Sequence, residues 1–147
     1  MEIKKVFIVG AGLMGSGIAQ ACAQAGIGVI LNDVSQAAID KGLKSIDWSV
    51  GKFIEKGKLA EKKETILNRI ETSIDFSGAA EADLAIEVVF ENLELKQEIF
   101  RKLDEACKPD TLLASNTSAI PITVLGAVTA RSNRVLGLHF FLSLIHI

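Results

Sequence analysis

Tyrosine is absent from this chain of 147 residues, and tryptophan, cysteine and proline are scarce, with one, two and two residues respectively. The cysteines, Cys22 and Cys107, lie far apart in apolar helical patterns, which excludes a disulfide-stapled fold and predicts buried free thiols in a reducing compartment. With so few prolines and no low-complexity run, the sequence contains no recognisable linker. The length therefore indicates one domain with a sizeable core.

An excess of positive charge is missing as well. Lysine and arginine number 16 against 18 aspartates and glutamates, and the net charge is −2 at pH 7. Because nucleic-acid-binding proteins generally carry a basic face, we expect no nucleic-acid partner, although a local basic patch for a phosphate-bearing ligand is compatible with this balance. Hydrophobic residues make up 49% of the chain, which excludes a disordered protein.

The stretch from Lys4 to Asp33, KKVFIVGAGLMGSGIAQACAQAGIGVILND, has two interpretations. Its charged start, apolar middle and small-residue end loosely imitate a secretory signal peptide. The alternative is a buried strand at 6–9, a tight turn and a helix over 13–25, as in a dinucleotide-binding unit. The G-x-G-x-x-G spacing in the turn favours the second interpretation.

Each of the three glycines has a mechanical role in that second interpretation. Gly10 permits the tight turn, Gly12 leaves the backbone open to a cofactor pyrophosphate, and Gly15 lets the helix lie close to the strand. The helix then offers unpaired N–H groups to the phosphates. A second apolar run at 29–31 leads to Asp33, which can bind the adenosine ribose hydroxyls and repel a 2′-phosphate. We therefore expect NAD as the cofactor, in preference to NADP.

Strand and helix patterns alternate through the rest of the chain. Ser35 can cap a long helix over 36–56, which ends at Gly57 and is followed by a shorter helix over 61–68. We expect this pair to project as an antiparallel helical hairpin. Further elements are predicted as strands at 70–74, 84–89, 111–114 and 135–138, and as helical segments at 79–82, 93–107 and from Pro121. This alternation indicates an α/β fold, a Rossmann-type doubly wound parallel sheet.

Polar residues follow several of the predicted strands. Four of them stand at or just beyond strand ends: Asp33, Glu87, Ser115 and His139. The carboxyl ends of parallel strands meet at one edge of a sheet, where ligands gather, so we expect these side chains to converge. Taken alone, Glu87 is also explained as a residue that closes a strand, and His139 as a structural histidine.

Four blocks of the sequence are typical of one known family, in its order and at similar separations: VGAGLMGSGIAQ, DLAIEVVFENLELKQEIF, LLASNTSAIPIT and VLGLHFF. On these blocks the chain, from Lys4 to Phe141, resembles the NAD-binding domain of the 3-hydroxyacyl-CoA dehydrogenases, particularly the bacterial 3-hydroxybutyryl-CoA dehydrogenases. The resemblance implies oxidation of (S)-3-hydroxyacyl-CoA to 3-oxoacyl-CoA by hydride transfer to NAD, in fatty acid or butanoate metabolism. It also implies a cytoplasmic protein without a membrane partner.

The resemblance implies roles for individual residues. For cofactor binding these are Gly10, Ala11, Gly12, Leu13, Met14, Gly15, Asp33, Glu91, Lys96, Asn116 and Ser118. For catalysis they are His139 and Ser118, and a histidine suits proton transfer because it titrates near neutral pH. For coenzyme A they are Ser49, Lys56 and Ser118, and no metal ion is expected. Glu91 and Lys96 are also consistent with a solvated helix start and a surface lysine, and Trp48 is interpreted as a packing residue.

The resemblance ends after Phe141. The family continues with asparagine and proline, a strand with a glutamate that orients the histidine, and a helical dimerisation and substrate domain, whereas this sequence reads LSLIHI over 142–147. We expect residues 1–141 to be the NAD-binding domain, 142–147 to be a non-native tail, and the helical domain to be absent. The chain alone should then bind NAD weakly, turn over acyl-CoA poorly or not at all, and self-associate, whereas the complete parent should be a homodimer.

Two other functions remain open at this point. A related two-domain dehydrogenase that acts on another 3-hydroxyacid shares the plan, but it needs neither the long hairpin nor the SNTS and HFF blocks. The second alternative is a non-enzymatic, dehydrogenase-like structural or NAD-binding protein, since the family resembles a lens structural protein.

Overall fold

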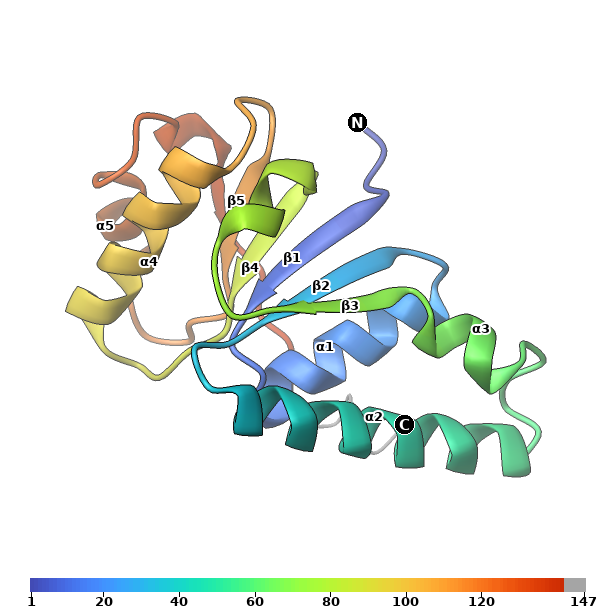
Figure 1. Ribbon diagram of the computed structural model, residues 1–147. Coiled ribbons are helices and arrows are strands. Elements are labelled where there is room, and N and C mark those ends of the chain that lie inside the picture. The colour runs from blue at the N-terminus through green and yellow to red at the C-terminus, as the bar shows by residue number, and fades with distance from the viewer. Residues whose placement is uncertain (142–147) are drawn as a thin grey trace.

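The computed structural model describes residues 1–141, and its centre is a parallel sheet of six strands (Figure 1). The strands are β1 (Lys5–Val9), β2 (Gly28–Asn32), β3 (Ile70–Ser73), β4 (Leu84–Glu87), β5 (Leu112–Ser115) and β6 (Val135–Gly137). They lie side by side in the order β3-β2-β1-β4-β5-β6. This order reverses between β1 and β4, so the carboxyl ends of these two strands open the crevice where such sheets bind ligands.

Helices cover both faces of the sheet. They are α1 (Leu13–Gln24), α2 (Gln36–Glu55), α3 (Lys63–Leu67), α4 (Leu93–Ala106) and α5 (Ile122–Gly126), with 3₁₀ turns η1 (Ser77–Glu81) and η2 (Ser132–Arg134). In Figure 1 the helices α1 and α2 lie below the sheet and α4 and α5 lie on its other side. The predicted α/β fold with a doubly wound parallel sheet is confirmed.

The central strand β1 shows why the sheet is covered on both faces. Val6 and Ile8 belong to the core cluster under α1 and α2, whereas Phe7 and Val9 belong to the cluster under α4. All four side chains are buried. Because successive side chains of a strand point to opposite faces, an unbroken apolar run can only be satisfied between two layers of helices.

The predicted helical pair between β2 and β3 is present. Ser35 caps α2 as expected, since its Oγ accepts a hydrogen bond of 3.2 Å from the Ala38 N–H. The inner face of α2 is buried against the core through Ile39, Ile46 and Val50. Figure 1 shows the far end of α2 and the whole of α3 extending past the edge strand β3. The second helix is shorter than the predicted 61–68.

The fourth strand is also shorter than the predicted 84–89. It ends at Glu87, because the Val89 N–H donates to Oε1 of Glu87 at 2.6 Å rather than to a neighbouring strand. The chain therefore turns directly after Glu87. This early turn brings Val88 and Val89 over the first glycine of the loop after β1.

Both cysteines are free thiols, as expected. Cys107 is buried and Cys22 is partly buried. Burial raises the pKa of the Cys22 thiol to about 11, and burial likewise raises that of Cys107 to about 11. Neither thiol is therefore ionised near neutral pH. Among residues 1–141, no helix is long and apolar enough to cross a membrane.

Candidate functional site

The loop after β1 can be built only with glycine at two of its positions. Gly10 has a φ of +113°, and a Cβ on it would lie 2.6 Å from the Val88 carbonyl oxygen. A Cβ on Gly15 would lie 1.8 Å from the carbonyl oxygen of Gly10, so α1 touches the loop that precedes it. Both glycines therefore have the structural roles predicted from their spacing.

Gly12 has a different environment, because it faces open space. Apart from Gly12 and its two chain neighbours, no heavy atom of residues 1–141 lies within 4 Å of the position that its Cβ would take. Gly12 is the N-cap of α1 without a side-chain hydrogen bond, and the first helical bond runs from the Ser16 N–H to its carbonyl oxygen at 2.9 Å. The N–H groups before Ser16 thus have no acceptor within the helix. The N–H groups of this loop, which includes Ala11, Leu13 and Met14, could therefore donate hydrogen bonds to a pyrophosphate.

Asp33 lies directly after β2 and beside this loop. Its Oδ2 accepts a hydrogen bond of 2.9 Å from the Ala11 N–H, and its Oδ1 accepts one of 2.9 Å from the Ser35 N–H. The carboxylate therefore joins the glycine loop to the start of α2. Each carboxylate oxygen has a second lone pair, and the side chain is only partly buried, so Asp33 can also accept hydrogen bonds from ribose hydroxyls.

Lys96 is buried inside the protein and not on its surface. Its Nζ lies 2.6 Å from Oε1 of Glu87 and 3.2 Å from Oε1 of Glu91, and it donates to the Val89 carbonyl oxygen at 3.1 Å. These three acceptors match the three N–H bonds of an ammonium group. The alternative of a surface lysine is therefore wrong, and Glu87 does more than close a strand.

Glu91 is half exposed and borders the same network. Burial opposes its charge, but the Thr117 hydroxyl and the Lys96 ammonium outweigh this effect and hold the pKa of Glu91 below its usual value. The Thr117 Oγ1 donates to Oε2 of Glu91 at 2.7 Å. Glu91 is thus an ionised side chain held in place between the end of β4 and the start of α4. The alternative of a freely solvated helix start is wrong.

Glu87 also fixes the segment after β5. Its Oε2 accepts a hydrogen bond of 2.6 Å from the Ser115 Oγ, which itself accepts one of 3.1 Å from the Thr117 N–H. The buried Thr117 Oγ1 then accepts bonds from the N–H groups of Ala119 and Ile120. With Ser115 and Thr117 held inward, the alternate residues Asn116 and Ser118 are left partly buried and exposed, respectively.

His139 follows β6 and is oriented by Asn116. Its Nδ1 lies 2.9 Å from the Asn116 carbonyl oxygen, and the Phe140 N–H donates to Oδ1 of Asn116 at 2.6 Å. A carbonyl oxygen can only accept, so Nδ1 must carry the proton of the neutral ring. The lone pair of the neutral imidazole is then on Nε2, and His139 is exposed. The arrangement can accept a proton from a ligand at Nε2.

The strand register brings most of the predicted residues to one edge. Val9 pairs with both Asn32 and Glu87, Glu87 pairs with Ser115, and Ser115 pairs with Gly137. Residues that follow these positions therefore end at the same level of the sheet, as predicted for Asp33 and His139. Ser49 and Lys56 lie elsewhere, on α2 and at its C-cap, and the Ser49 Oγ accepts a hydrogen bond of 2.9 Å from the Gln20 side chain.

Sequence reasoning missed the buried ion pair of Glu87 with Lys96 and the hydrogen bonds of Thr117. One signal could have indicated the ion pair. Lys96 falls on the apolar stripe of α4, one turn before Ile99 and Phe100, where a lysine needs a buried partner. The polar end of the neighbouring buried strand, Glu87, is the obvious candidate for that partner.

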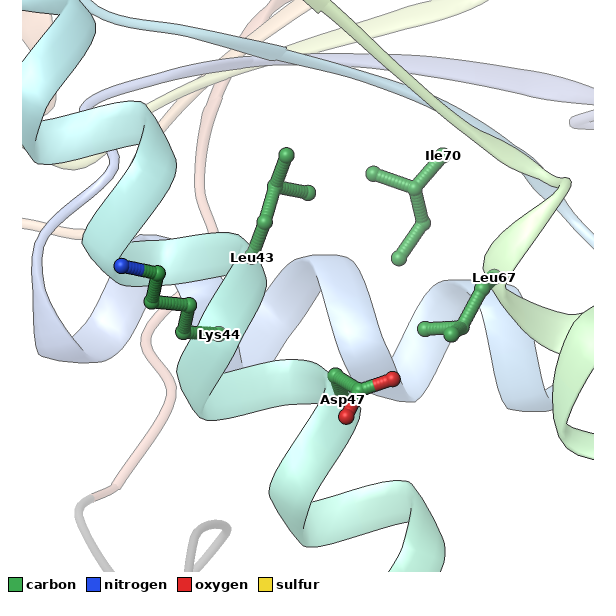
Figure 2. Close-up of a pocket in the computed structure, with 5 residues that line it drawn as sticks. All are labelled: Leu43, Lys44, Asp47, Leu67 and Ile70. Carbon is green, nitrogen blue, oxygen red and sulfur yellow. The ribbon is translucent and has the colours of Figure 1, made fainter.

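A hollow of about 430 Å³ lies between α2, α3 and β3. Figure 2 shows the five side chains that line it: Leu43, Lys44, Asp47, Leu67 and Ile70. Ile70 is the first residue of β3, so the hollow lies at the amino end of the sheet, away from the glycine loop. It is therefore not part of the edge where Asp33 and His139 converge.

The chain is similar to known proteins over its described length. The family described as "3-hydroxyacyl-CoA dehydrogenase, NAD binding domain" matches residues 5–144. A "Probable 3-hydroxybutyryl-CoA dehydrogenase" of Bacillus subtilis is 47% identical over 141 residues, which are 95% of this chain and 49% of that protein. One from Deinococcus radiodurans is 43% identical over 136 residues, 92% of this chain and 49% of that protein.

Solved structures agree with the sequence comparison. The crystal structure of (S)-3-hydroxybutyryl-CoA dehydrogenase PaaH1 from Ralstonia eutropha matches with a TM-score of 0.91 and 44% identity. The match covers 95% of this chain and 50% of that one. The chain thus spans about half the length of the relatives that it matches.

Proposed function

The chain belongs to the family of NAD-binding domains of 3-hydroxyacyl-CoA dehydrogenases, with NAD as its cofactor, and on this premise we propose that it serves the oxidation of a 3-hydroxyacyl-CoA to the 3-oxoacyl-CoA. The relatives named 3-hydroxybutyryl-CoA dehydrogenase favour a four-carbon acyl group. The observation that carries the proposal is the bond between the Asn116 carbonyl and His139 Nδ1, which leaves Nε2 as a proton acceptor at the cofactor edge.

We propose that the glycine loop binds the pyrophosphate of NAD and that Asp33 binds its adenosine ribose. The free N–H groups at the start of α1 face the pyrophosphate, and the loop from Gly10 to Gly15 has no side chain at Gly12 to block it. The Asp33 carboxylate accepts from the ribose hydroxyls and repels a 2′-phosphate. Lys96 acts from inside the protein, by holding Glu91 and the turn after β4.

We propose that His139 and Ser118 act on the substrate hydroxyl group. Oxidation of a secondary alcohol breaks its O–H and C–H bonds and forms a C=O double bond. His139 Nε2 takes the hydroxyl proton, while the Ser118 hydroxyl donates a hydrogen bond to the same oxygen. Bound NAD supplies the acceptor for the hydride that leaves carbon. Asn116 positions His139 through its backbone carbonyl and holds the following peptide through its side chain.

We propose that α2 contributes to coenzyme A binding through Ser49 and Lys56. The two positions are seven residues apart, or two helical turns, and so share one face. The Ser49 hydroxyl accepts from Gln20 and keeps its own proton for a ligand. Lys56 is exposed at the C-cap of α2 and can approach a phosphate.

We also propose that the complete parent is a homodimer and that this chain self-associates. Large apolar side chains are open to solvent at the cofactor edge and after β6, with Phe90 86% and Phe141 69% exposed. The expectation of a non-native tail at 142–147 lies outside the described residues. Light scattering over a concentration series tests self-association, and a constant monomer mass would contradict it.

A single-turnover assay tests the proposed function. With the chain in excess over NADH, so that one slow turnover suffices, acetoacetyl-CoA should be reduced, whereas free acetoacetate should not. The variant His139→Gln should react about 10²- to 10⁴-fold more slowly with unchanged NAD affinity, because only the proton acceptor is lost. Equal rates for the thioester and the free acid would contradict a CoA substrate, and an unaffected His139→Gln variant would contradict the role of His139.

A further inference from the structure

Trp48 is exposed, contrary to the expectation that it packs inside the hairpin. Its exposed fraction is 66%, and it lies on α2 directly before Ser49. Buried tryptophans stabilise a core, but an exposed one leaves a large aromatic face in water. The packing of α2 therefore does not explain this side chain, and it is available to a ligand.

Lysines occur on both sides of Trp48 along α2. The four positions Lys44, Trp48, Lys52 and Lys56 follow one another at intervals of four residues, so they lie along one gradually turning face of the helix. The Nζ of Lys52 lies 6.0 Å from the centre of the Trp48 ring. This row, which we call the Trp48 row, presents an aromatic face flanked by positive charge on a chain whose net charge is −2.

The charges of the Trp48 row are accessible to an anionic ligand. Lys52 has a partner in Glu55, 3.0 Å away, but both side chains are largely exposed, and such surface pairs contribute little free energy. Lys44 and Lys56 are exposed. A ligand that suits the row combines a flat aromatic ring with several phosphate groups.

We propose that the Trp48 row binds the nucleotide end of coenzyme A, with the adenine ring stacked on Trp48 and the phosphates beside Lys52 and Lys56. This inference rests on the proposed function, in which Ser49 and Lys56 already contact coenzyme A. It adds the residue that recognises the base. Stacking on an aromatic side chain and attraction by a neighbouring cation both favour such a ligand.

Two alternatives fit the region less well: binding of coenzyme A in the neighbouring hollow, and a second copy of the chain as the partner of the row. The hollow beside Lys44 is lined mainly by Leu43, Leu67 and Ile70, and its charged residues include the carboxylate of Asp47. A second copy of the chain carries the same positive row, so two rows facing each other would repel. The charge of the row therefore favours a polyphosphate ligand.

The sequence provides a direct probe, because Trp48 is the one tryptophan and there is no tyrosine. Its fluorescence therefore reports this site alone. The unmodified chain is titrated with adenosine 3′,5′-bisphosphate, which is the nucleotide end of coenzyme A without the diphosphate linkage, and with pantetheine, which lacks the nucleotide. We expect saturable quenching by the bisphosphate and by coenzyme A, and none by pantetheine.

Calorimetry then measures the coenzyme A affinity of variants in which one side chain of the row is replaced. Trp48→Ala should weaken binding roughly 5- to 150-fold, the worth of one base–aromatic stack. Lys52→Gln should weaken it roughly two- to fivefold. The matched control is Lys102→Gln on α4, because Lys102 also lies 6.0 Å from an aromatic ring, that of Phe76, but outside the Trp48 row. The control should bind coenzyme A unchanged.

The outcomes separate the inference from the proposed function. The inference is overturned if coenzyme A causes no quenching, if Trp48→Ala binds it unchanged, or if the fluorescence shifts with protein concentration alone, since a second copy then covers the ring. Because Trp48 is exposed, Trp48→Ala should keep its melting temperature and its NAD affinity. If acetoacetyl-CoA is reduced while Trp48→Ala binds normally, the proposed function stands and only the role of Trp48 is lost.

Discussion

The ammonium group of Lys96 lies 2.6 Å from Oε1 of Glu87, and the two side chains are 1% and 0% exposed. This buried pair joins the apolar face of α4 to the end of β4. Through Ser115 it also reaches the segment that orients His139. The pair therefore connects the core of the domain to the groups proposed to act on substrate.

Removing one partner of this pair should destabilise the fold strongly. Lys96→Met leaves the Glu87 carboxylate buried without a compensating charge, and we expect a loss of about 3–5 kcal/mol in the free energy of unfolding. Urea denaturation measures it. The control Lys102→Met removes the exposed pair with Glu98, 2.7 Å long, and should cost less than about 1 kcal/mol. Similar losses for the two variants would refute the structural importance of the buried pair.

Two glycine variants should separate folding from cofactor binding. Gly12→Ala places its Cβ in open space, so the melting temperature should be nearly unchanged while NAD affinity falls at least tenfold, because the methyl group occupies the pyrophosphate position. Gly15→Ala places its Cβ 1.8 Å from the Gly10 carbonyl oxygen and should lower the melting temperature as well. Thermal denaturation and calorimetry check both. Gly12→Ala with full NAD affinity would show that the pyrophosphate lies elsewhere.

The choice between the two nicotinamide cofactors should depend on Asp33. Asp33→Ala removes a charged acceptor of the ribose hydroxyls and should weaken NAD binding roughly 10- to 100-fold, the range of one hydrogen bond to a charged group. NADP binding should fall less, because the variant loses the bond to the Ala11 N–H with either cofactor but also loses the repulsion of the 2′-phosphate. Calorimetry with both cofactors gives the ratio of affinities. If the ratio does not change, Asp33 does not contact the ribose.

Acid stability should depend on Asp83. The side chain of Lys108, 2.7 Å away, and the N–H groups of Lys4 and Lys5 lower the pKa of Asp83 from 3.8 to about 2. Since the pKa is lower in the folded state than in the unfolded state, the stabilisation is complete above pH 3.8 and is lost as the pH falls toward about 2. Asp83→Asn should therefore flatten the fall of stability across this window. Denaturation at several pH values measures it, and an unchanged slope would contradict the prediction.

Much of the fold could be predicted because its signals are local. The β-branched run before Gly10 and the spacing of the three glycines determine a strand, a turn and a helix without help from distant residues. The convergence of Asp33 and His139 also followed, since all strands of the predicted sheet run in parallel. These positions depend on topology, and topology followed from the alternation of patterns.

The environment of single side chains could not be predicted in the same way. A lysine and a tryptophan carry no local mark of burial, so Lys96 was compatible with the surface and Trp48 with the interior, and both alternatives were wrong. Their positions depend on which face of α4 and α2 meets the rest of the protein. The tautomer of His139 depends on a carbonyl group 23 residues earlier, at Asn116.

The two hydrogen bonds of Asp33 have a mechanical consequence. One carboxylate holds both the loop before α1 and the first turn of α2, and α2 is a continuous rod of 20 residues, about 30 Å long. If ribose hydroxyls also bind these oxygens and shift the carboxylate, the near end of α2 tilts with it, and a small tilt there moves the far end by a larger distance. Binding of a nucleotide beside one end of α2 would then shift the side chains at the other end of the same helix.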